Sequence, residues 1–538
     1  MNLSRSAQLG VYGGILIALG SYGSGANRYR GGLVHALGLD WITYGHGQIF
    51  CEIVIWVGIA LLLISWLRIG RELLFSKETI RDIVAGSAHS GATADAMARA
   101  STDGDESTLR RFNSILLAWA IPLALAAPLF SRDVYSYLMQ GAMVRDGFDP
   151  YTEGAAANPG PMLLEVSADW RNTTTPYGPL HLGIGEVITR IVGDNITVGV
   201  ILYRIVCLLG FAAIVWSIPR IARALGANPA FAQWLGVLNP LVLLHLIAGM
   251  HNEALMVGLV SLALVAALRM EHMRGGLVAA VLIGIGVALK ATAILALPFV
   301  VWIVLTRREP ITTVHKMLRK IPAIAGVGIA LVAVCVGTLA VVTWLTGSSW
   351  GWISEISGNT KVINPLAAPS AVAGVISGVM AWFNDDIGFN IIVSHTRVVS
   401  SVIMLVGLVI CWFYFRSTPR NNVAGMIAAY VVACVFNAVA LPWYYASLLT
   451  PMGTIRPPRW VIQGTVLFTF ILSLSFAGGG NHRFYDVPWM VIITVLGWLA
   501  VGWLTTGKFS WKYPWRDDKT AANTDSTVAP LPRSTEVA

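Results

Sequence analysis

Long apolar stretches alternate with short polar segments along most of the chain, and this pattern predicts a bundle of membrane-spanning helices. An α-helix needs about 20 consecutive apolar residues to cross the hydrocarbon core of a bilayer. A transmembrane β-barrel would instead alternate apolar and polar residues with a period of two. The predicted spans lie at 9–23, 49–67, 113–130, 197–217, 231–248, 254–268, 276–305, 322–345, 397–415, 423–441, 460–477 and 488–505.

Positive charge orients these spans, because Lys and Arg are enriched in the cytoplasmic loops of membrane proteins. Basic residues concentrate in segment 68–111, in segment 307–320 and after Lys508. We therefore expect these segments and both termini to be cytoplasmic. Polar composition with few aromatic residues predicts disorder in 84–108 and in the tail 508–538.

This orientation is self-consistent only if two regions each cross the membrane twice. Segment 276–305 is flanked by basic residues on both sides, so it must be a pair of short helices with a break near Lys290. The chain must also return inward over 444–455. The total is then about 14 crossings. Broken helices are tolerated in membranes where they line an enclosed cavity, so both regions are predicted cavity walls.

Two of the predicted outer segments are large, and we expect both to form short interfacial helices. The first, 131–196, is rich in Pro, Gly, Tyr and Trp; the second, 346–396, contains a weakly apolar piece at 366–382. We interpret that piece as re-entrant or interfacial. Residues 1–507 then form one transmembrane domain, and residues 508–538 form a separate tail.

Composition agrees with a membrane protein and narrows the function classes. Charged residues make up 12% of the chain, against about 25% in soluble proteins. The net charge of +9 comes from short inter-span segments, so it does not indicate nucleic-acid binding. All five cysteines lie in or beside apolar stretches, without zinc-ligand spacing or a disulfide framework. The apolar N-terminus resembles a signal peptide, but we favour an uncleaved first span.

A polar run stands at the outer end of the predicted span 113–130. It runs Ser-Arg-Asp-Val-Tyr-Ser-Tyr and contains Asp133. Ionisable groups at the mouth of a membrane helix are costly to keep near hydrocarbon, and by default they mark functional sites. Further along the same segment stand Asp149, Tyr151 and Tyr177, a carboxylate and aromatic set that suits sugar binding. For the aromatic residues alone, an interfacial belt is the better explanation.

Three polar residues in succession, His251, Asn252 and Glu253, stand between two apolar stretches on the same predicted face. A tight helical hairpin with a polar tip is the competing explanation. Two aromatic residues, Trp443 and Tyr444, stand at another outer helix break. We group these five residues with the carboxylate and aromatic set as candidates for binding a sugar or an acceptor.

Several cations could meet an anionic ligand on the outer side. Lys290 is embedded in apolar sequence at the predicted helix break, where it either snorkels to the interface or caps a cavity and faces an anion. Arg132, Lys361, His395 and Arg397 are further outer cations. No motif supports soluble nucleotide use, zinc hydrolysis or redox chemistry. A divalent metal has no distinct ligand cluster, and no cofactor is expected.

At these residues the chain resembles the GT-C glycosyltransferases. It is most similar to the actinobacterial α-1,6-mannosyltransferases that use polyprenol-phosphate mannose and build the mannan core of lipomannan. Glu253 stands where many relatives have Asp. The matching pieces are Thr-Tyr-Gly-His-Gly-Gln (43–48), Arg-Asp-Val-Tyr-Ser-Tyr (132–137), Gln-Gly (140–141), Asp-Pro-Tyr (149–151), Pro-Tyr-Gly-Pro-Leu (176–180), Gly-Met-His-Asn-Glu (249–253) and Pro-Trp-Tyr (442–444).

The resemblance implies a GT-C fold and an inverting transfer at the outer face of the plasma membrane. Mannose would move from polyprenyl-phosphate mannose to a mannosylated glycolipid acceptor, with membrane lipid as surroundings and no nucleic acid involved. In such inversion one carboxylate deprotonates the attacking hydroxyl, and the position that matches the family's base is Asp133. The leaving phosphate needs positive charge, for which Lys290, Arg397, His395, Lys361 and Arg132 are the candidates.

Two alternatives remain open from the sequence. A polyprenyl-phosphate pentosyltransferase, such as an arabinosyltransferase, would share this architecture. A transporter or flippase of lipid-linked glycans would also have broken helices and intramembrane charge. Transporters commonly show paired internal repeats, which we do not find, and seldom carry a long outer loop rich in Tyr, Trp and acidic residues.

Overall fold

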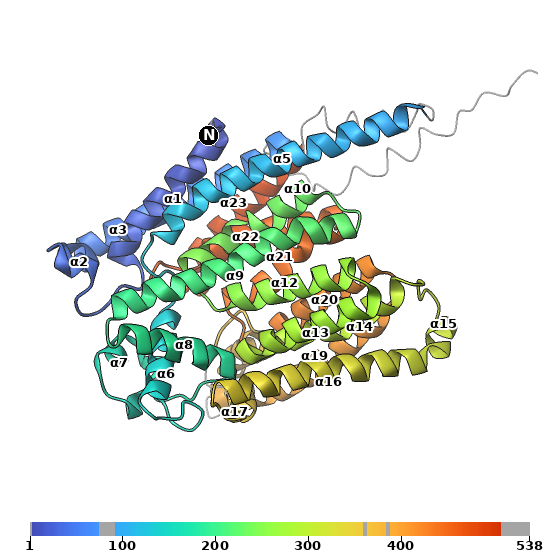
Figure 1. Ribbon diagram of the computed structural model, residues 1–538. Coiled ribbons are helices and arrows are strands. Elements are labelled where there is room, and N and C mark those ends of the chain that lie inside the picture. Colours follow the sequence, from blue (N-terminus) through green and yellow to red (C-terminus); the bar gives the residue numbers. More distant parts are fainter. Residues whose placement is uncertain (1–2, 75–91, 359–362, 384–387, 507–538) are drawn as a thin grey trace, which may run out of the picture.

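The chain folds into a bundle of long helices with a cap of short helices at one end (Figure 1). The computed structural model describes residues 3–74, 92–358, 363–383 and 388–506. Among these residues the only β contact is an isolated bridge between Phe476 and His482, so the predicted all-α class is confirmed. The long helices are α1 (Arg5–Ser24), α3 (Gly45–Leu74), α5 (Ala92–Ala124), α9 (Ile196–Ala224), α12 (Glu253–Arg269), α13 (His272–Leu289), α16 (Ile321–Leu345), α19 (Phe389–Tyr414), α20 (Pro419–Phe436), α22 (Arg459–Ser473) and α23 (Val487–Thr506).

Six of the described helices are long and apolar enough to cross a membrane, which confirms a multi-pass membrane protein. The number rises to seven if a helix pair bent by 56°, 229–237 and 240–248, is one broken span. The count of about 14 crossings therefore stays a prediction. The six helices are α3, α9, α13, α16, α19 and α23.

Small residues bring the N-terminal helices close together. A Cβ atom added at Gly13 of α1 would lie 2.7 Å from the carbonyl oxygen of Gly58 on α3, and one at Gly58 would meet Gly13 at the same distance. Such close backbone contact is how membrane helices gain packing energy without help from the hydrophobic effect. The pair α1 and α3 lies beside α5 along one edge of the bundle in Figure 1.

Helix α5 departs from the sequence prediction at both ends. It begins at Ala92, so the disorder predicted for 84–108 is wrong for the helical part, while 84–91 lies outside the described residues. The helix ends at Ala124, well short of the predicted span end at 130. The predicted disordered tail 508–538 also lies outside the described residues.

The chain after α5 is extended and is held by backbone hydrogen bonds to distant segments. Ala26 N–H donates to the Pro128 carbonyl over 2.8 Å, and Phe130 N–H donates to the Gly478 carbonyl over 2.8 Å. Pro128 has no N–H and cannot continue a helix. These hydrogen bonds fix the segment between neighbouring elements, and they thereby fix the position at which the next helix, α6 (Asp133–Arg145), begins.

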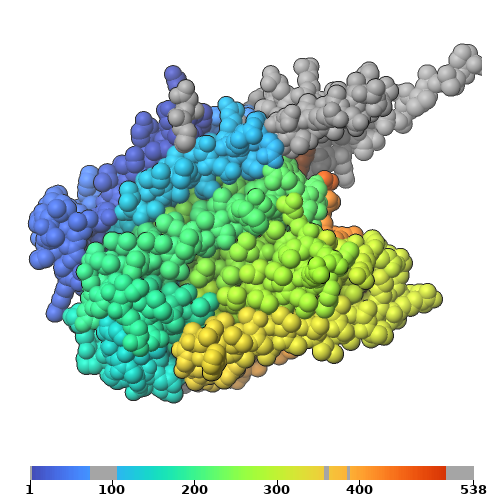
Figure 2. Space-filling model, viewed as in Figure 1, coloured from blue at the N-terminus to red at the C-terminus, as the bar shows by residue number. Residues whose placement is uncertain are grey.

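Both large outer segments contain the short helices that the sequence predicts. In Figure 2 the first forms the bulge at one end of the molecule, with α17 against it. Two of its helices cross at contact distance, since a Cβ added at Gly141 of α6 would lie 2.1 Å from the carbonyl carbon of Gly185 on α8. The short helices of these segments are α6, η2 (Ala155–Ala157), α7 (Pro161–Glu165), η3 (Ala168–Trp170), α8 (Pro179–Val192), α17 (Trp352–Gly358) and α18 (Ala368–Met380).

The helix break predicted at Lys290 is confirmed. Helix α13 ends at Leu289, and Lys290 is extended, with φ −153° and ψ 125°, before the chain turns into η6. Residues 442–455 also consist of short pieces, as predicted, although the structure does not test whether they cross the membrane. The remaining short helices are α2 (Leu33–Ala36), η1 (Asp40–Thr43), α10 (Pro229–Ala232), η4 (Gln233–Val237), α11 (Pro240–Leu243), η5 (Leu244–Ala248), η6 (Ala291–Ala296), α14 (Leu297–Thr306), α15 (Val314–Arg319), η8 (Pro442–Tyr445), α21 (Ala446–Met452) and η9 (Gly453–Ile455).

Candidate active site

Two strained turns bring Asp133 and His251 together. Phe130 and Met250 have φ values of 66° and 55°, in the left-handed region that bulky residues rarely adopt. Strain of this kind costs about 1–3 kcal/mol per residue and persists only where the surroundings enforce it. Each strained residue stands just before a site residue, so the backbone is held in place where precise positioning is needed.

A chain of hydrogen bonds fixes the start of α6. The His251 Nδ1 lies 2.9 Å from the His245 carbonyl oxygen, which can only accept, so this nitrogen carries the proton. Burial lowers the pKa of His251, so the ring is neutral and its Nε2 accepts from the Ser131 hydroxyl over 2.9 Å. Ser131 Oγ in turn accepts from the Asp133 N–H over 3.2 Å. His251 therefore acts on the Asp133 backbone indirectly, through the Ser131 hydroxyl.

The Asp133 carboxylate is largely enclosed, with 13% of its side chain exposed. Burial and the nearby Glu253 carboxylate raise the pKa of Asp133 to about 6, against the opposing effects of Lys290 and of the hydrogen bond from Tyr137. The Tyr137 hydroxyl donates to Asp133 Oδ2 over 3.3 Å. A carboxylate with this pKa is ionised at neutral pH yet can still accept a proton, as a general base must.

Lys290 and Glu253 form a buried ion pair beside this carboxylate. The ammonium donates to Glu253 Oε1, and the two side chains are 10% and 1% exposed. The ammonium also lies 3.9 Å from the ring centroid of Tyr444 and 5.6 Å from that of Tyr177. Buried charges are stable only when they are paired or bind a ligand of opposite charge. The helix break therefore places the Lys290 ammonium where Glu253 and the two tyrosine rings stabilise it.

Two adjoining cavities connect Asp133 to Lys290. Both are lined by Pro176, Tyr177, Val439 and Tyr444. The first has a volume of about 50 Å³ and contains Asp133 in its wall. The second has a volume of about 120 Å³ and contains Lys290. Both are smaller than the roughly 300–1,000 Å³ of typical ligand sites.

Aromatic rings pack tightly behind the cavities. The ring of His251 stacks on Trp443, with centroids 3.7 Å apart and planes inclined by 15°. On the other side, His181 Nε2 lies 3.0 Å from Gln140 Oε1, and the His181 and Tyr177 ring centroids are 4.4 Å apart. These contacts fix the walls. Tyr177 and Tyr444 line both cavities, and Tyr137 and Trp170 also line the one at Asp133.

Comparison with known proteins assigns the chain to a family. A family model described as the N-terminal domain of α-(1→6)-mannopyranosyltransferases matches residues 7–307, and a model for the MptB C-terminal domain matches residues 369–506. The chain belongs to the α-(1→6)-mannopyranosyltransferase family. In this family member the first match contains Asp133 and Lys290, while Tyr444 comes from the second, so the site is built from both matched regions.

Curated relatives agree over nearly the whole chain. An α-(1→6)-mannopyranosyltransferase A of Corynebacterium glutamicum is 51% identical over 492 residues, which cover 90% of this chain and 95% of the relative. An α-(1→6)-mannopyranosyltransferase A of Mycobacterium tuberculosis is 34% identical over 481 residues, which cover 89% of this chain and 86% of the relative. The resemblance to α-1,6-mannosyltransferases of the GT-C type is confirmed, and the chain is a membrane glycosyltransferase that transfers mannose.

A solved structure is also similar to the chain. The arabinosyltransferase EmbB from Mycobacterium smegmatis matches 86% of this chain and 41% of its own, with 12% sequence identity and a TM-score of 0.36. A TM-score at this level does not establish a shared fold.

The structure brings together about half of the predicted site residues. Asp133, Tyr177, Lys290, Glu253 and Tyr444 line the two cavities or a small one adjoining them. His251, Asn252 and Trp443 are buried behind that wall. These three residues are 0–4% exposed, so they support the wall and are not positioned to contact a sugar.

Other predicted residues lie elsewhere. Exposed Asp149 accepts from the Tyr151 N–H over 2.9 Å and stabilises a local turn. His395 and Arg397 stand on the first turns of α19, where the sequence pattern predicts the end of a loop. The walls of the two cavities include none of these four residues, and Lys361 lies outside the described residues.

Arg132 points away from Asp133. Its guanidinium donates to Glu165 Oε2 over 2.8 Å and to the Asn27 carbonyl over 2.6 Å, and it lies 3.7 Å from the ring centroid of Tyr29. Sequence neighbours at a helix start project in different directions, because successive residues are 100° apart around an α-helix. Arg132 therefore anchors α6 to the segment after α1.

Some wall residues carried no role in the sequence analysis. His181, Thr292 and Asn437 contact the site residues or line a cavity. His181 follows the Pro-Tyr-Gly-Pro-Leu piece directly, and Thr292 follows Lys290 by two residues, so closeness to a motif was the available signal. Asn437 is the C-cap of α20, after a largely apolar stretch, and offered no comparable signal.

Proposed function

We propose that this chain transfers mannose from polyprenyl-phosphate mannose to a growing α-1,6-mannan on a lipid anchor. The observation that carries the proposal is the pairing of a buried carboxylate, Asp133, with a buried cation, Lys290, in adjoining cavities. Relatives named as α-(1→6)-mannopyranosyltransferases support mannose as the sugar. The reaction takes place at the outer membrane face, with both termini in the cytoplasm.

In the proposed step Asp133 is the base. The acceptor hydroxyl oxygen attacks the anomeric carbon of the mannose, its proton passes to the Asp133 carboxylate, and the bond from that carbon to the phosphate oxygen breaks. Because the sugar is β-linked in the donor and α-linked in the product, a single displacement inverts the configuration. The electron pair leaves with polyprenyl phosphate, which already is a good leaving group and needs no acid.

Lys290 is placed to meet the developing charge on the phosphate. The cation contributes most where it already points at the position that becomes negative. Glu253 holds the ammonium when no donor is bound, and the donor phosphate competes with Glu253 for it. Tyr177 and Tyr444 line both cavities, and their rings supply faces for the sugar between the base and the cation.

The test is a transfer assay with the purified full-length chain in detergent micelles. The donors are polyprenyl-phosphate mannose and its arabinose counterpart, and the acceptor is a short α-1,6-linked mannoside with a lipid tail. We expect one α-1,6-linked mannose to be added from the first donor only. Transfer of the pentose alone, or release of mannose without an acceptor product, would overturn the proposal.

A further inference from the structure

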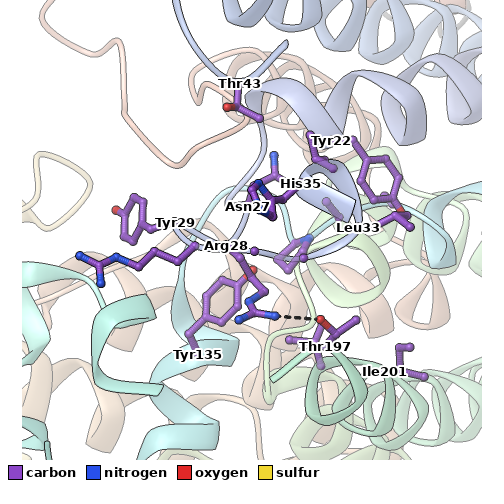
Figure 3. A pocket seen from close by; sticks show the side chains of 18 of the residues that line it. Tyr22, Asn27, Arg28, Tyr29, Leu33, His35, Thr43, Tyr135, Thr197 and Ile201 are labelled. Atoms are coloured by element: carbon purple, nitrogen blue, oxygen red, sulfur yellow. Dashed lines mark hydrogen bonds between the residues drawn. The ribbon is translucent and has the colours of Figure 1, made fainter. Parts of the chain in front are cut away.

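A large cavity, separate from the two at Asp133 and Lys290, is lined by Tyr135 of α6 (Figure 3). Its volume of about 800 Å³ far exceeds that of the two cavities at Asp133 and Lys290. The walls are segment 27–35 after α1, the end of α5, Tyr135 of α6 and the first turns of α9. A volume of this size is typical of sites that bind small molecules.

Part of the mouth of this cavity is apolar. Leu33, Leu125 and Ile201 line it and are 52%, 66% and 53% exposed. Ile201 belongs to α9, one of the helices that can span a membrane. In a bilayer such exposed apolar side chains face lipid chains, so the cavity opens sideways towards the membrane.

The lining of the cavity carries an excess of positive charge. Three arginines line it, Arg28, Arg30 and Arg204, against a single carboxylate, Asp40, which lies 3.0 Å from His35. Within the described part of the chain, neither Arg30 nor Arg204 makes an ion pair with a carboxylate.

Arg204 is a buried charge within a helix that can span the membrane. It lies eight residues after the first residue of α9, or about 12 Å along the axis. Its guanidinium donates to the carbonyl oxygens of Leu123, Ala124 and Ala126, at 2.6–3.1 Å. Carbonyls satisfy the donors but do not neutralise the charge. An intramembrane charge of this kind indicates a functional site.

Arg28 has a donor left over for a ligand. One of its nitrogens donates to the Thr197 hydroxyl over 3.1 Å, the bond drawn in Figure 3. Its Nε lies 3.5 Å from the Glu165 carboxylate and makes no hydrogen bond, although it is buried. Glu165 is shared with Arg132 at 2.8 Å, so one carboxylate faces two guanidinium groups.

We propose that this cavity binds a membrane lipid with an anionic phosphate headgroup. The phosphate contacts Arg28 and Arg30 and is also attracted by the Arg204 guanidinium. The acyl chains extend out of the cavity along Leu33 and Ile201. Helix α9 has 29 residues and is about 44 Å long, longer than the roughly 30 Å hydrocarbon core. Its end turns therefore lie at headgroup depth, where a lipid phosphate would be.

The site adjoins the catalytic helix through Arg132. That residue precedes α6 and donates to the Asn27 carbonyl, while the Tyr135 hydroxyl donates to the Ala26 carbonyl over 2.8 Å. Lipid binding would therefore stabilise the segment against which the Asp133 end of α6 rests.

The experiment is native mass spectrometry of the full-length chain released from detergent micelles, with phosphatidylglycerol or phosphatidylcholine as the probe. The variants are Arg30→Gln, which removes an exposed cation, and Ile201→Trp, which fills the mouth without changing charge. We expect each to lower retention of phosphatidylglycerol, Arg30→Gln by about fivefold. Arg190→Gln, which removes an exposed cation of α8 paired with Glu186, should not change retention.

The comparison arms decide between a lipid and a free anion. Phosphatidylcholine should be retained weakly and equally by all variants, and millimolar inorganic phosphate should not displace phosphatidylglycerol. Equal retention of both lipids, unchanged retention in both variants, or displacement by inorganic phosphate would overturn the proposal. The readout is lipid binding rather than mannose transfer, so it fails or succeeds independently of the reaction assigned to Asp133.

Discussion

At the scale of single residues, the site depends on two buried groups of opposite charge, Asp133 and Lys290. Asp133 is held near a second carboxylate, Glu253, and away from water, which raises its pKa to about 6. Lys290 lies close enough to favour the ionised form. This balance leaves Asp133 deprotonated at neutral pH but more basic than an ordinary aspartate, the compromise that a general base requires.

Replacing Asp133 by Asn should abolish turnover while leaving donor binding intact. Asn keeps the size and the hydrogen bonds but cannot take the proton, so we expect a loss on the order of 10²–10⁴-fold in kcat. The wild-type rate should fall as the pH drops below about 6, as the carboxylate becomes protonated. Asp194→Asn, at an exposed ion pair, is the matched control. Activity of Asp133→Asn within a few-fold of wild type would rule out Asp133 as the base.

The same pKa predicts the sign of a stability effect. Because the folded-state pKa is raised above its usual value of 3.8, folded protein binds more protons than unfolded protein between about pH 4 and pH 6. Stability therefore falls as the pH rises through this window. Thermal unfolding in detergent should show a weaker fall in Tm over this range for Asp133→Asn than for wild type.

Lys290 and Glu253 should be separable in a double-mutant cycle. Lys290→Gln alone leaves the Glu253 carboxylate buried and unpaired, which we expect to cost about 3–5 kcal/mol of stability. Adding Glu253→Gln should recover most of this stability without restoring donor affinity, because the phosphate has still lost its cation. Thermal unfolding and donor titration measure the two effects. Lys320→Gln, which breaks an exposed pair, is the control.

An alternative result of that cycle would be equally informative. If the double variant binds the donor as wild type does, the phosphate is held by another cation. If donor affinity instead falls in a manner that depends on acceptor length, Lys290 lies in the acceptor groove.

The sequence predicts residue types at this site better than their directions. Asp133 and Lys290 could be found because a charge inside apolar sequence is costly without a function. Arg132 has the same signal and yet faces Glu165, since sequence alone does not say which way a side chain turns at the start of α6. His251 was expected to bind a sugar, and its burial became visible only with the packing of Trp443.

At the scale of secondary structure, the distribution of basic residues predicted the helix break better than local helix propensity predicted helix ends. The break at Lys290 follows from basic residues on both flanks of 276–305, and the structure has it. The early end of α5 was missed because the residues from 115 to 130 are almost uniformly apolar. The first part of α5 was missed because 92–108 is polar, although Ala, Met and Arg there are good helix formers.

The crossing of α6 and α8 should tolerate no side chain. A Cβ at Gly141 would lie 2.1 Å from the backbone of Gly185, so Gly141→Ala must push the helices apart. We expect a loss of about 1–3 kcal/mol in unfolding free energy, with reduced transfer, because α6 carries Asp133. Gly160→Ala is the matched control, since nothing lies within 4 Å of a Cβ there and its φ of 175° is ordinary extended backbone. Equal Tm values for the two variants would contradict the close packing.

At the scale of the whole molecule, the site lies at one end of the bundle. Helix α16 has 25 residues, or about 37 Å, and runs from α15 to the neighbourhood of α17 (Figure 1). The Thr174 hydroxyl donates to Glu355 of α17, so the loop before Tyr177 belongs to the α17 end. The basic segment around α15 therefore lies at the opposite end from the cavities, which agrees with an outer site opposite a cytoplasmic basic cluster.

Cysteine labelling of single substitutions should place these two ends on opposite sides of the membrane. Ala157→Cys lies in the cap beside α7, and His315→Cys lies in α15; both positions are exposed. The five native cysteines are buried, so the unmodified chain should label weakly with a membrane-impermeant maleimide. We expect Ala157→Cys to react in intact cells and His315→Cys only after the membrane is opened, because Lys and Arg are retained on the cytoplasmic side. Labelling of both positions from the same side would remove the basis for an outer site. Labelling of His315→Cys alone in intact cells would place Asp133 in the cytoplasm, where a growing lipid-anchored mannan of the outer face could not reach it.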